Sequence, residues 1–297
     1  RAGGDSASRR PRRPEPGTTL VLRDLQTGAE VRIDEVGAFA MDDSAKWLAY
    51  AVPSRTPEQN GAFLRSLASG EVQPLLTGQG TYANLSFDRA GNRLAFVSDQ
   101  AEGSSEKPRF SAYLVTIARG RASTVAVATP DSAGRGMLIA ERGRLEVARD
   151  RAALQVPVMA VPLDSIPADS LADKAIFDLW HWEDPKLQPQ QRLEAMRNRN
   201  PTYTAVYQPT LRRFLRLGSE ELPQVTLGAS GRWAVAVTAE PYRVAAMWGE
   251  GGNDVWAINA ETGERQRVAE RIRLGATLSR GGAYAIWFEH GEWRRHA

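Results

Sequence analysis

The chain has 297 residues, of which 42% are hydrophobic, a formal charge of +3 and no cysteine. The lack of cysteine excludes disulfides, thiolate metal sites and a cysteine nucleophile, and no apolar run reaches the roughly 18 residues of a membrane span. With 26 glycines and 17 prolines, the chain is expected to form many turns between short strands rather than a few long helices.

The N-terminal stretch, residues 1–17, is rich in Arg, Pro, Gly and Ser and has almost no apolar content. Such a segment buries too little surface to offset its ordering entropy, so it is predicted to be a disordered linker. Its arginine cluster at 9–13 could contact nucleic acid or anionic lipid, but no aromatic residue or basic helix accompanies it. We therefore expect no nucleic-acid partner. The chain begins without Met and stops where a strand is expected to start, which indicates a piece of a longer polypeptide.

From Thr18 onward, a short phrase recurs: a turn, a bulky residue, then an apolar run of two to four residues. The copies lie at residues 43–50, 88–96, 230–235 and 281–287. The first two are about 46 residues apart and the last two about 51, which is the length of a β-propeller blade. One blade cannot bury both faces of its sheet, so several blades are expected to pack together.

A second element alternates with the first: an apolar strand, a turn ending in glycine, and a strand with alternating polar residues. Its copies end their turns at Gly28, Gly70, Gly120 and Gly263. Glycine suits these positions because such hairpin turns require a positive φ. We expect this strand pair to form the outer half of each blade and the first phrase, with the strand before it, to form the inner half.

Counting both elements predicts an all-β fold: a β-propeller of about five or more four-stranded blades, some incomplete, in one domain over residues 18–297. A weaker copy at 142–159 is separated from the next anchor, Trp233, by about 80 residues. This blade is therefore predicted to carry an insertion over about 163–207. Within it, residues 189–199 favour a helix, because Pro189 suits a first turn and two apolar residues share a face.

Part of this insertion, residues 180–191, has the pattern Trp-x-Trp-x-Asp-x-x-Leu-Gln-Pro-x-Gln. Pro241-Tyr242-Arg243, Trp248, Asp254-Val255-Trp256 and residues 284–288 follow in order. Together they resemble the N-terminal propeller region of bacterial prolyl-oligopeptidase-family (S9) serine peptidases, and the resemblance covers most of residues 18–293. The repeated phrase alone resembles the WD40-like repeats of TolB-type propellers, a broader similarity.

The S9 resemblance implies a parent with two parts, a propeller and a C-terminal α/β-hydrolase domain that carries a Ser-Asp-His triad. It also implies a peptide substrate, restricted access through the propeller, and a periplasmic or secreted location. The chain departs from a complete enzyme because it has no Gly-x-Ser-x-Gly elbow. The nearest segment, residues 228–231, has the wrong spacing and lies in a repeat turn. No catalytic residue is therefore assigned here.

For the other residues that could take part in catalysis or binding, the sequence favours structural roles. His181 lies between Trp180 and Trp182 without a second histidine or a suitably spaced carboxylate pair, so a packed histidine is favoured over a metal ligand or a catalytic group. The two tryptophans could stack on a ligand, but aromatic residues between blades normally fill the core. The pairs Asp42-Asp43 and Glu183-Asp184 are expected to serve turns and caps, because adjacent strand residues face opposite sides.

Pro241-Tyr242-Arg243 directly follows the predicted strand 233–238, where loops reach the end of a blade. There, Arg243 could clamp a peptide carboxylate or carbonyl through its forked donors, with Tyr242 packing alongside. The alternative is a salt bridge between blades. The loop at 249–253 lacks the lysine, the hydroxyl residue and the helix of a phosphate loop, so no cofactor is expected.

Two functions from different classes remain open. One is the non-catalytic propeller of an S9-type peptidase, which would gate and position peptides for a hydrolase domain outside this chain. The other is a TolB-like propeller that recruits a partner protein through loops on one face. Fold alone does not choose between them, because propellers host many functions.

Overall fold

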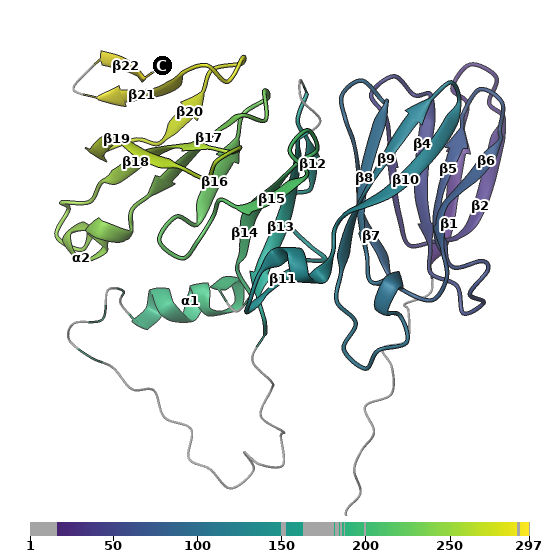
Figure 1. Ribbon diagram of the computed structural model, residues 1–297, viewed down its shortest axis with the longest axis horizontal. Helices are drawn as coiled ribbons and strands as arrows, with labels where there is room; N and C mark the ends of the chain where they lie inside the picture. The colour runs from purple at the N-terminus through teal and green to yellow at the C-terminus, as the bar shows by residue number, and fades with distance from the viewer. Residues whose placement is uncertain are drawn as a thin grey trace, which may run out of the picture. The chain divides into compact units, whose positions relative to one another are not determined.

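The computed structural model describes residues 17–149, 153–162, 181, 184, 186, 188–198, 200–289 and 292–296. These residues form antiparallel sheets with few helices (Figure 1). Nearly all of the predicted linker, residues 1–17, lies outside this described part. The chain divides into two compact units, residues 1–126 and 127–297. The single domain over 18–297 stays a prediction.

The N-terminal unit contains three sheets of consecutive strands, in the orders β1-β2, β3-β4-β5-β6 and β7-β8-β9-β10. The elements are β1 (Thr18–Arg23), β2 (Glu30–Val36), β3 (Ala38–Met41), β4 (Trp47–Val52), β5 (Gly61–Ser66), β6 (Val72–Thr77), β7 (Tyr82–Phe87), β8 (Arg93–Ser98), η1 (Gln100–Glu102), β9 (Ser111–Ala118) and β10 (Arg121–Ala128).

The C-terminal unit also contains three sheets, in the orders β11-β13-β14-β15 with β12 beside β13, β16-β17-β18-β19, and β20-β21-β22. The elements are η2 (Pro130–Ala133), β11 (Met137–Ile139), β12 (Glu146–Val147), β13 (Leu154–Ala160), α1 (Gln188–Asn198), β14 (Thr202–Gln208), β15 (Arg213–Arg216), β16 (Gln224–Leu227), β17 (Trp233–Thr238), η4 (Glu240–Tyr242), α2 (Arg243–Ala246), β18 (Asn253–Asn259), β19 (Arg265–Ile272), β20 (Ala276–Leu278), β21 (Ala285–Glu289) and β22 (Glu292–His296).

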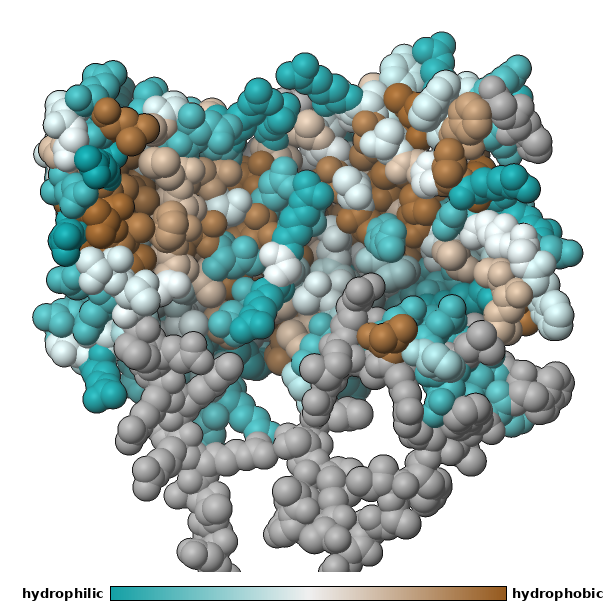
Figure 2. Space-filling view, turned by 180° about the vertical axis from the view of Figure 1, so that it is seen from behind, coloured by the Kyte–Doolittle hydropathy of each residue, from teal (hydrophilic) through white to brown (hydrophobic). Residues whose placement is uncertain are grey.

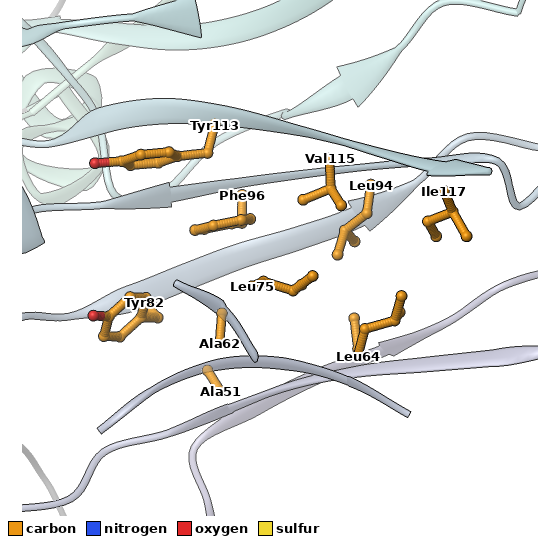
Figure 3. Close-up of a cluster of buried hydrophobic side chains, with 11 residues drawn as sticks. Ala51, Ala62, Leu64, Leu75, Tyr82, Leu94, Phe96, Tyr113, Val115 and Ile117 are labelled. Atoms are coloured by element: carbon orange, nitrogen blue, oxygen red, sulfur yellow. The ribbon is translucent and has the colours of Figure 1, made fainter. Parts of the chain in front are cut away.

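Sheets that follow one another in sequence pack face to face within each unit. In the N-terminal unit, Ala51 and Leu64 of one sheet meet Phe96 and Tyr113 of the next in a single buried cluster (Figure 3). The rings of Phe96 and Tyr113 stack with their centroids 5.1 Å apart. Burying each large side chain of this kind contributes about 1.5–3 kcal/mol. Four-stranded meanders that pack in series are propeller blades, so the predicted all-β propeller class is confirmed.

The predicted helix is confirmed as α1, Gln188–Asn198. The blade resumes earlier than the predicted end of the insertion, because residues 202–207 belong to β14, which pairs with β13. The polar residues Thr202 and Thr204 make the start of this strand look like part of the insertion in the sequence. Tyr203, Ala205 and Val206 are nevertheless buried, and they fix it in the sheet.

The recurring turn has one backbone geometry in both units. Its first residue donates its N–H to the carbonyl oxygen five residues later, at distances of 2.7–3.2 Å for Asp42, Asp88, Ala148, Gly228 and Ser279. Where it is described, the fourth residue of the turn is left-handed: Ala45, Gly91, Gly231 and Gly282 have φ values of 50°, 68°, 67° and 69°. The shared turn explains why the phrase recurs although its residues vary.

Asp42 performs the turn role expected of it. Its buried carboxylate accepts hydrogen bonds from the backbone N–H groups of Ser44, Lys46 and Trp47, and from the Ser44 hydroxyl. Burial acts to raise the pKa of Asp42. The hydrogen bonds from Ser44, Trp47 and Lys46 outweigh this effect and hold the pKa below the ordinary value of 3.8.

We expect Asp42→Asn to lower the free energy of unfolding by about 1–2 kcal/mol at pH 7. A folded-state pKa below the unfolded value means that the carboxylate stabilises the fold above about pH 3.9 and loses this effect as pH falls through the folded pKa. Urea unfolding at several pH values between 2 and 7 should therefore show the gap between wild type and variant closing in acid. A gap independent of pH would contradict this account.

Candidate substrate-binding site

Both residues predicted to bind substrate lie in a short helical segment directly after β17. The segment consists of η4 and α2, and Pro241 stands in the first turn of η4, where its fixed φ suits the start of a helix. Tyr242 ends η4 and Arg243 begins α2. The sequence therefore located this segment correctly at the end of a blade strand.

Tyr242 is anchored to the next strand of the same blade. Its hydroxyl donates a 2.6 Å hydrogen bond to Oδ1 of Asp254, a β18 residue that is only 2% exposed. This hydrogen bond, followed by burial, raises the pKa of Tyr242 above 10.0, because ionisation would place two negative charges side by side. The guanidinium of Arg271 lies over the Tyr242 ring, 5.6 Å from its centroid. The phenol is thus fixed at both its edge and its face.

Asp254 connects the helical segment to β19. Its Oδ2 accepts a 3.3 Å hydrogen bond from Nη1 of Arg267, and its Oδ1 accepts a 3.1 Å bond from the backbone N–H of Arg271. The β18–β19 pairing is irregular between Asn253 and Val255, the two neighbours of Asp254. This irregularity lets one buried carboxylate reach the helical segment and the adjacent strand together.

Arg271 has a strained backbone conformation. Its φ is +51°, a left-handed value that costs a residue with a side chain roughly 1–2 kcal/mol. Gly252 approaches it closely, since a Cβ at position 252 would lie 2.6 Å from Cγ of Arg271. Arg271 lies on β19, where its left-handed backbone belongs to the irregular β18–β19 pairing and brings its N–H to Asp254.

Arg243, Arg267 and Arg271 form a charged cluster with their carboxylate partners. Each of the three arginines faces a carboxylate of its own blade. Arg243 pairs with Glu240, three residues before it, and Nη2 of Arg271 lies 3.4 Å from Oε2 of Glu250. Arg267 contacts Glu270 as well as Asp254. The Arg243 pair is local and does not join two blades. The three pairs with glutamates join partly exposed side chains and are therefore weak, so a ligand carboxylate could exchange with the glutamates.

Exposed apolar side chains follow Arg243 in the chain. Val244, Met247 and Trp248 are exposed on α2 and the turn after it, and Trp248 is 82% exposed. Figure 2 shows one face of the molecule, on which apolar side chains reach the surface between polar ones. Large aromatic side chains with forked cations nearby are typical of surfaces that bind peptides or proteins.

The sequence did not reveal the roles of Asp254, Arg267 and Arg271. Asp254 stands at the start of an apolar strand, directly after Gly251-Gly252-Asn253, and it belongs to one of the segments that resemble S9 propellers, but neither signal indicated its contacts. Its contacts join residues 12–17 positions apart through an irregular hairpin. A hydrophobic pattern does not encode such contacts, so the supporting residues required the structure.

The remaining candidate residues form hydrogen bonds within turns or lie outside the described residues. His181 is exposed, and its backbone N–H donates to Oδ2 of Asp184 at 3.1 Å, which gives Asp184 the expected turn role. Trp180, Trp182 and Glu183 are outside the described part of the chain. Ser230 lies in the β16–β17 turn, where its Oγ accepts from the Arg232 N–H at 3.4 Å.

The described ranges contain neither a metal-binding cluster nor a membrane-spanning helix. No group of three or more His, Asp or Glu residues there is placed to hold a metal ion. Among the same residues, no helix has the length and apolar character needed to cross a bilayer.

Neither a family model nor a curated protein matches the sequence. Similar solved structures include TolB from Acinetobacter baumannii (14% identity, TM-score 0.37), of which the match covers 53%, against 91% of this chain. The β-propeller domain of the Trilobed protease from Pyrococcus furiosus has 10% identity and a TM-score of 0.40, with 93% of this chain and 73% of that one covered.

A structure from a study of two prolyl endopeptidases has 12% identity and a TM-score of 0.44, with 92% of this chain and 36% of that one covered. The chain thus spans about half of the TolB structure and about a third of the prolyl endopeptidase. TolB proteins and peptidases are the two groups that the repeated phrase and residues 180–191 resemble.

Proposed function

We propose that this chain is the non-catalytic propeller segment of an S9-type serine peptidase, in which it gates and positions peptides. The hydrolase domain would lie outside these 297 residues, and the parent protein would be periplasmic or secreted. The observation that carries the proposal is the charged loop after β17, where Tyr242 and Arg243 stand at a blade end and exposed Trp248 follows them in the chain.

The role proposed for Tyr242 and Arg243 is peptide binding. The Arg243 fork would exchange its partner Glu240 for a carboxylate or carbonyl of the peptide, while Tyr242, held by Asp254, keeps its place beside it. The chemistry itself would be supplied by the serine of the hydrolase domain, since this sequence has no nucleophile elbow. The work of the propeller is then steric selection and orientation.

A protein-binding propeller of the TolB-like kind is the second candidate. The exposed apolar side chains of Val244, Met247 and Trp248 favour it, because a partner's apolar surface could cover them. Treating the full-length protein with a fluorophosphonate probe separates the two functions. Labelling of a serine outside this chain supports the peptidase, and a full-length protein that resists the probe favours the binding propeller.

We expect Arg243→Ala to weaken peptide capture by the full-length protein about tenfold, because a charge-assisted hydrogen bond contributes about 1.5–3 kcal/mol. The matched control is Arg232→Ala. Arg232 is also a partly exposed arginine of this blade, 3.7 Å from Glu261 and at the opposite end of β17. Peptide affinity and thermal stability should be measured for both variants. Unchanged capture by Arg243→Ala with reduced thermal stability would rule out the binding role.

A further inference from the structure

The C-terminal unit contains a cavity of about 250 Å³ that the proposed function does not use. It is formed where β12, β16 and β20 end and their recurring turns begin, so three successive sheets contribute equivalent positions. The residue after the first turn residue is Arg149 in one sheet, Ala229 in the next and Arg280 in the third. Two arginines therefore flank a gap left by a small side chain.

Gln155 provides the polar group most deeply placed in this cavity. It lies on β13 opposite Glu146, is only 4% exposed, and lines the cavity. Within the described part of the chain, no hydrogen bond engages its side-chain amide, so the cavity is where this amide can find a partner. Because Gln155 lines the cavity and its amide atoms are not enclosed by protein, the amide can hydrogen-bond a molecule that enters.

The charges at the cavity favour a monoanion. No ion pair joins Arg149 or Arg280 to a carboxylate among the residues that the structure describes, so both guanidinium groups are available. Glu146 is held by Arg144, with 2.6 Å between Nη2 and Oε2, and it stays on the cavity wall. Its negative charge disfavours a dianion such as phosphate, whereas a forked guanidinium matches a single carboxylate.

We propose that this cavity binds one carboxylate of a peptide, either the C-terminal group or an acidic side chain. The inference rests on the proposed function for the peptide character of its ligand. Arg149 and Arg280 would each donate to the carboxylate, the Gln155 amide would donate from the cavity floor, and Thr226 and Thr277 would supply hydroxyl groups from the wall. A volume of about 250 Å³ is below the usual range for drug-sized ligands, so it suits one terminal group rather than several residues.

The test is calorimetric titration of the 297-residue chain with three acetylated peptides: tetraalanine with a free carboxylate, its C-terminal amide, and an amidated analogue with one internal aspartate. We expect the amide to bind at least tenfold more weakly than the free carboxylate. Binding of the aspartate analogue assigns an acidic side chain as a ligand, and its failure to bind assigns the chain end. Equal affinity for the neutral amide and the free carboxylate overturns the proposal.

Variants test whether binding occurs at this cavity. Arg149→Ala and Arg280→Ala should each weaken carboxylate binding about tenfold, and Ala229→Trp should abolish it by filling the gap. The control is Arg89→Ala, because Arg89 follows the first turn residue Asp88 in the N-terminal unit and is exposed in the same way. Circular dichroism verifies that each variant is folded. Unchanged binding by folded Ala229→Trp overturns the site.

The result of fluorophosphonate labelling and the result of the peptide titration are independent of each other. A protein that the probe labels but that shows no preference for carboxylate peptides refutes only the carboxylate site. A protein that resists the probe but prefers carboxylate peptides refutes the peptidase and keeps the site on a binding propeller.

Discussion

Gly231→Ala is expected to lower the free energy of unfolding by about 3 kcal/mol or more, a larger effect than most single substitutions have. Gly231 is the left-handed fourth residue of the β16–β17 turn, with φ +67°. A Cβ at this position would lie 2.6 Å from Cβ of Ala153 and 3.1 Å from Cβ of Ala148 in the preceding blade. The substitution therefore adds steric overlap, about 1–3 kcal/mol, to left-handed strain of about 1–2 kcal/mol.

Gly263→Ala is the matched control, because it separates strain from overlap. Gly263 ends the β18–β19 turn with φ +84°, and a Cβ there would meet no atom within 4 Å. We expect Gly263→Ala to lower the free energy of unfolding only by the cost of the left-handed backbone conformation, about 1 kcal/mol. Urea unfolding of both variants, followed by tryptophan fluorescence, measures the difference. If the two variants were equally destabilised, close packing of the turn against the preceding blade would not be the cause of the stability lost in Gly231→Ala.

The blade repeats were predictable because their signals are local. The glycines at 28, 70, 120 and 263 all adopt positive φ in hairpin turns, as their place between two strand patterns indicates. The recurring turn was found through its bulky residue, although its first residue changes from Asp42 to Gly228. Turn geometry depends on a few adjacent residues, and one sequence is sufficient to reveal it.

Features that depend on distant pairing were not predictable. The strand β11 pairs with β13 on the side opposite β14, yet it is three residues long and follows a glycine-rich turn that predicts only a loop. The start of β14 at Thr202, where the chain rejoins the sheet of β13, was not predicted because threonines alternate with the buried residues. The division into two compact units carries no linker signal, because the boundary at 126 falls inside β10.

The candidate site was predictable only in part, for the same physical reason. Tyr242 and Arg243 were found because they follow an apolar strand directly. Asp254, the residue that holds Tyr242, acts across a hairpin whose register is irregular. The sequence thus identifies partly exposed side chains at the end of a strand more readily than the buried group that holds one of them.

Asp254→Ala is expected to lower the free energy of unfolding by about 3 kcal/mol and to weaken peptide capture together with it. The carboxylate is buried and satisfies three donors: the Tyr242 hydroxyl, the Arg267 guanidinium and the backbone N–H of Arg271. Removing it leaves these donors without that acceptor, and hydrogen bonds to charged groups contribute about 1.5–3 kcal/mol each before compensation by water. It also removes the contact that holds the left-handed backbone at Arg271.

Asp254→Asn and Tyr242→Phe separate positioning from simple loss of stability. The asparagine keeps an oxygen that can accept from Tyr242 and Arg271, so it should restore most of the stability that the alanine variant loses. A double-mutant cycle of Asp254→Ala with Tyr242→Phe should give a coupling free energy of about 1 kcal/mol or more, because the two groups share one hydrogen bond. If Asp254 positions the loop, the affinity for peptide should recover with Asp254→Asn under conditions where all variants are fully folded. Capture that is insensitive to Asp254→Ala under those conditions would show that peptide binding does not depend on the orientation of Tyr242, and the loop after β17 would lose its place in the proposed function.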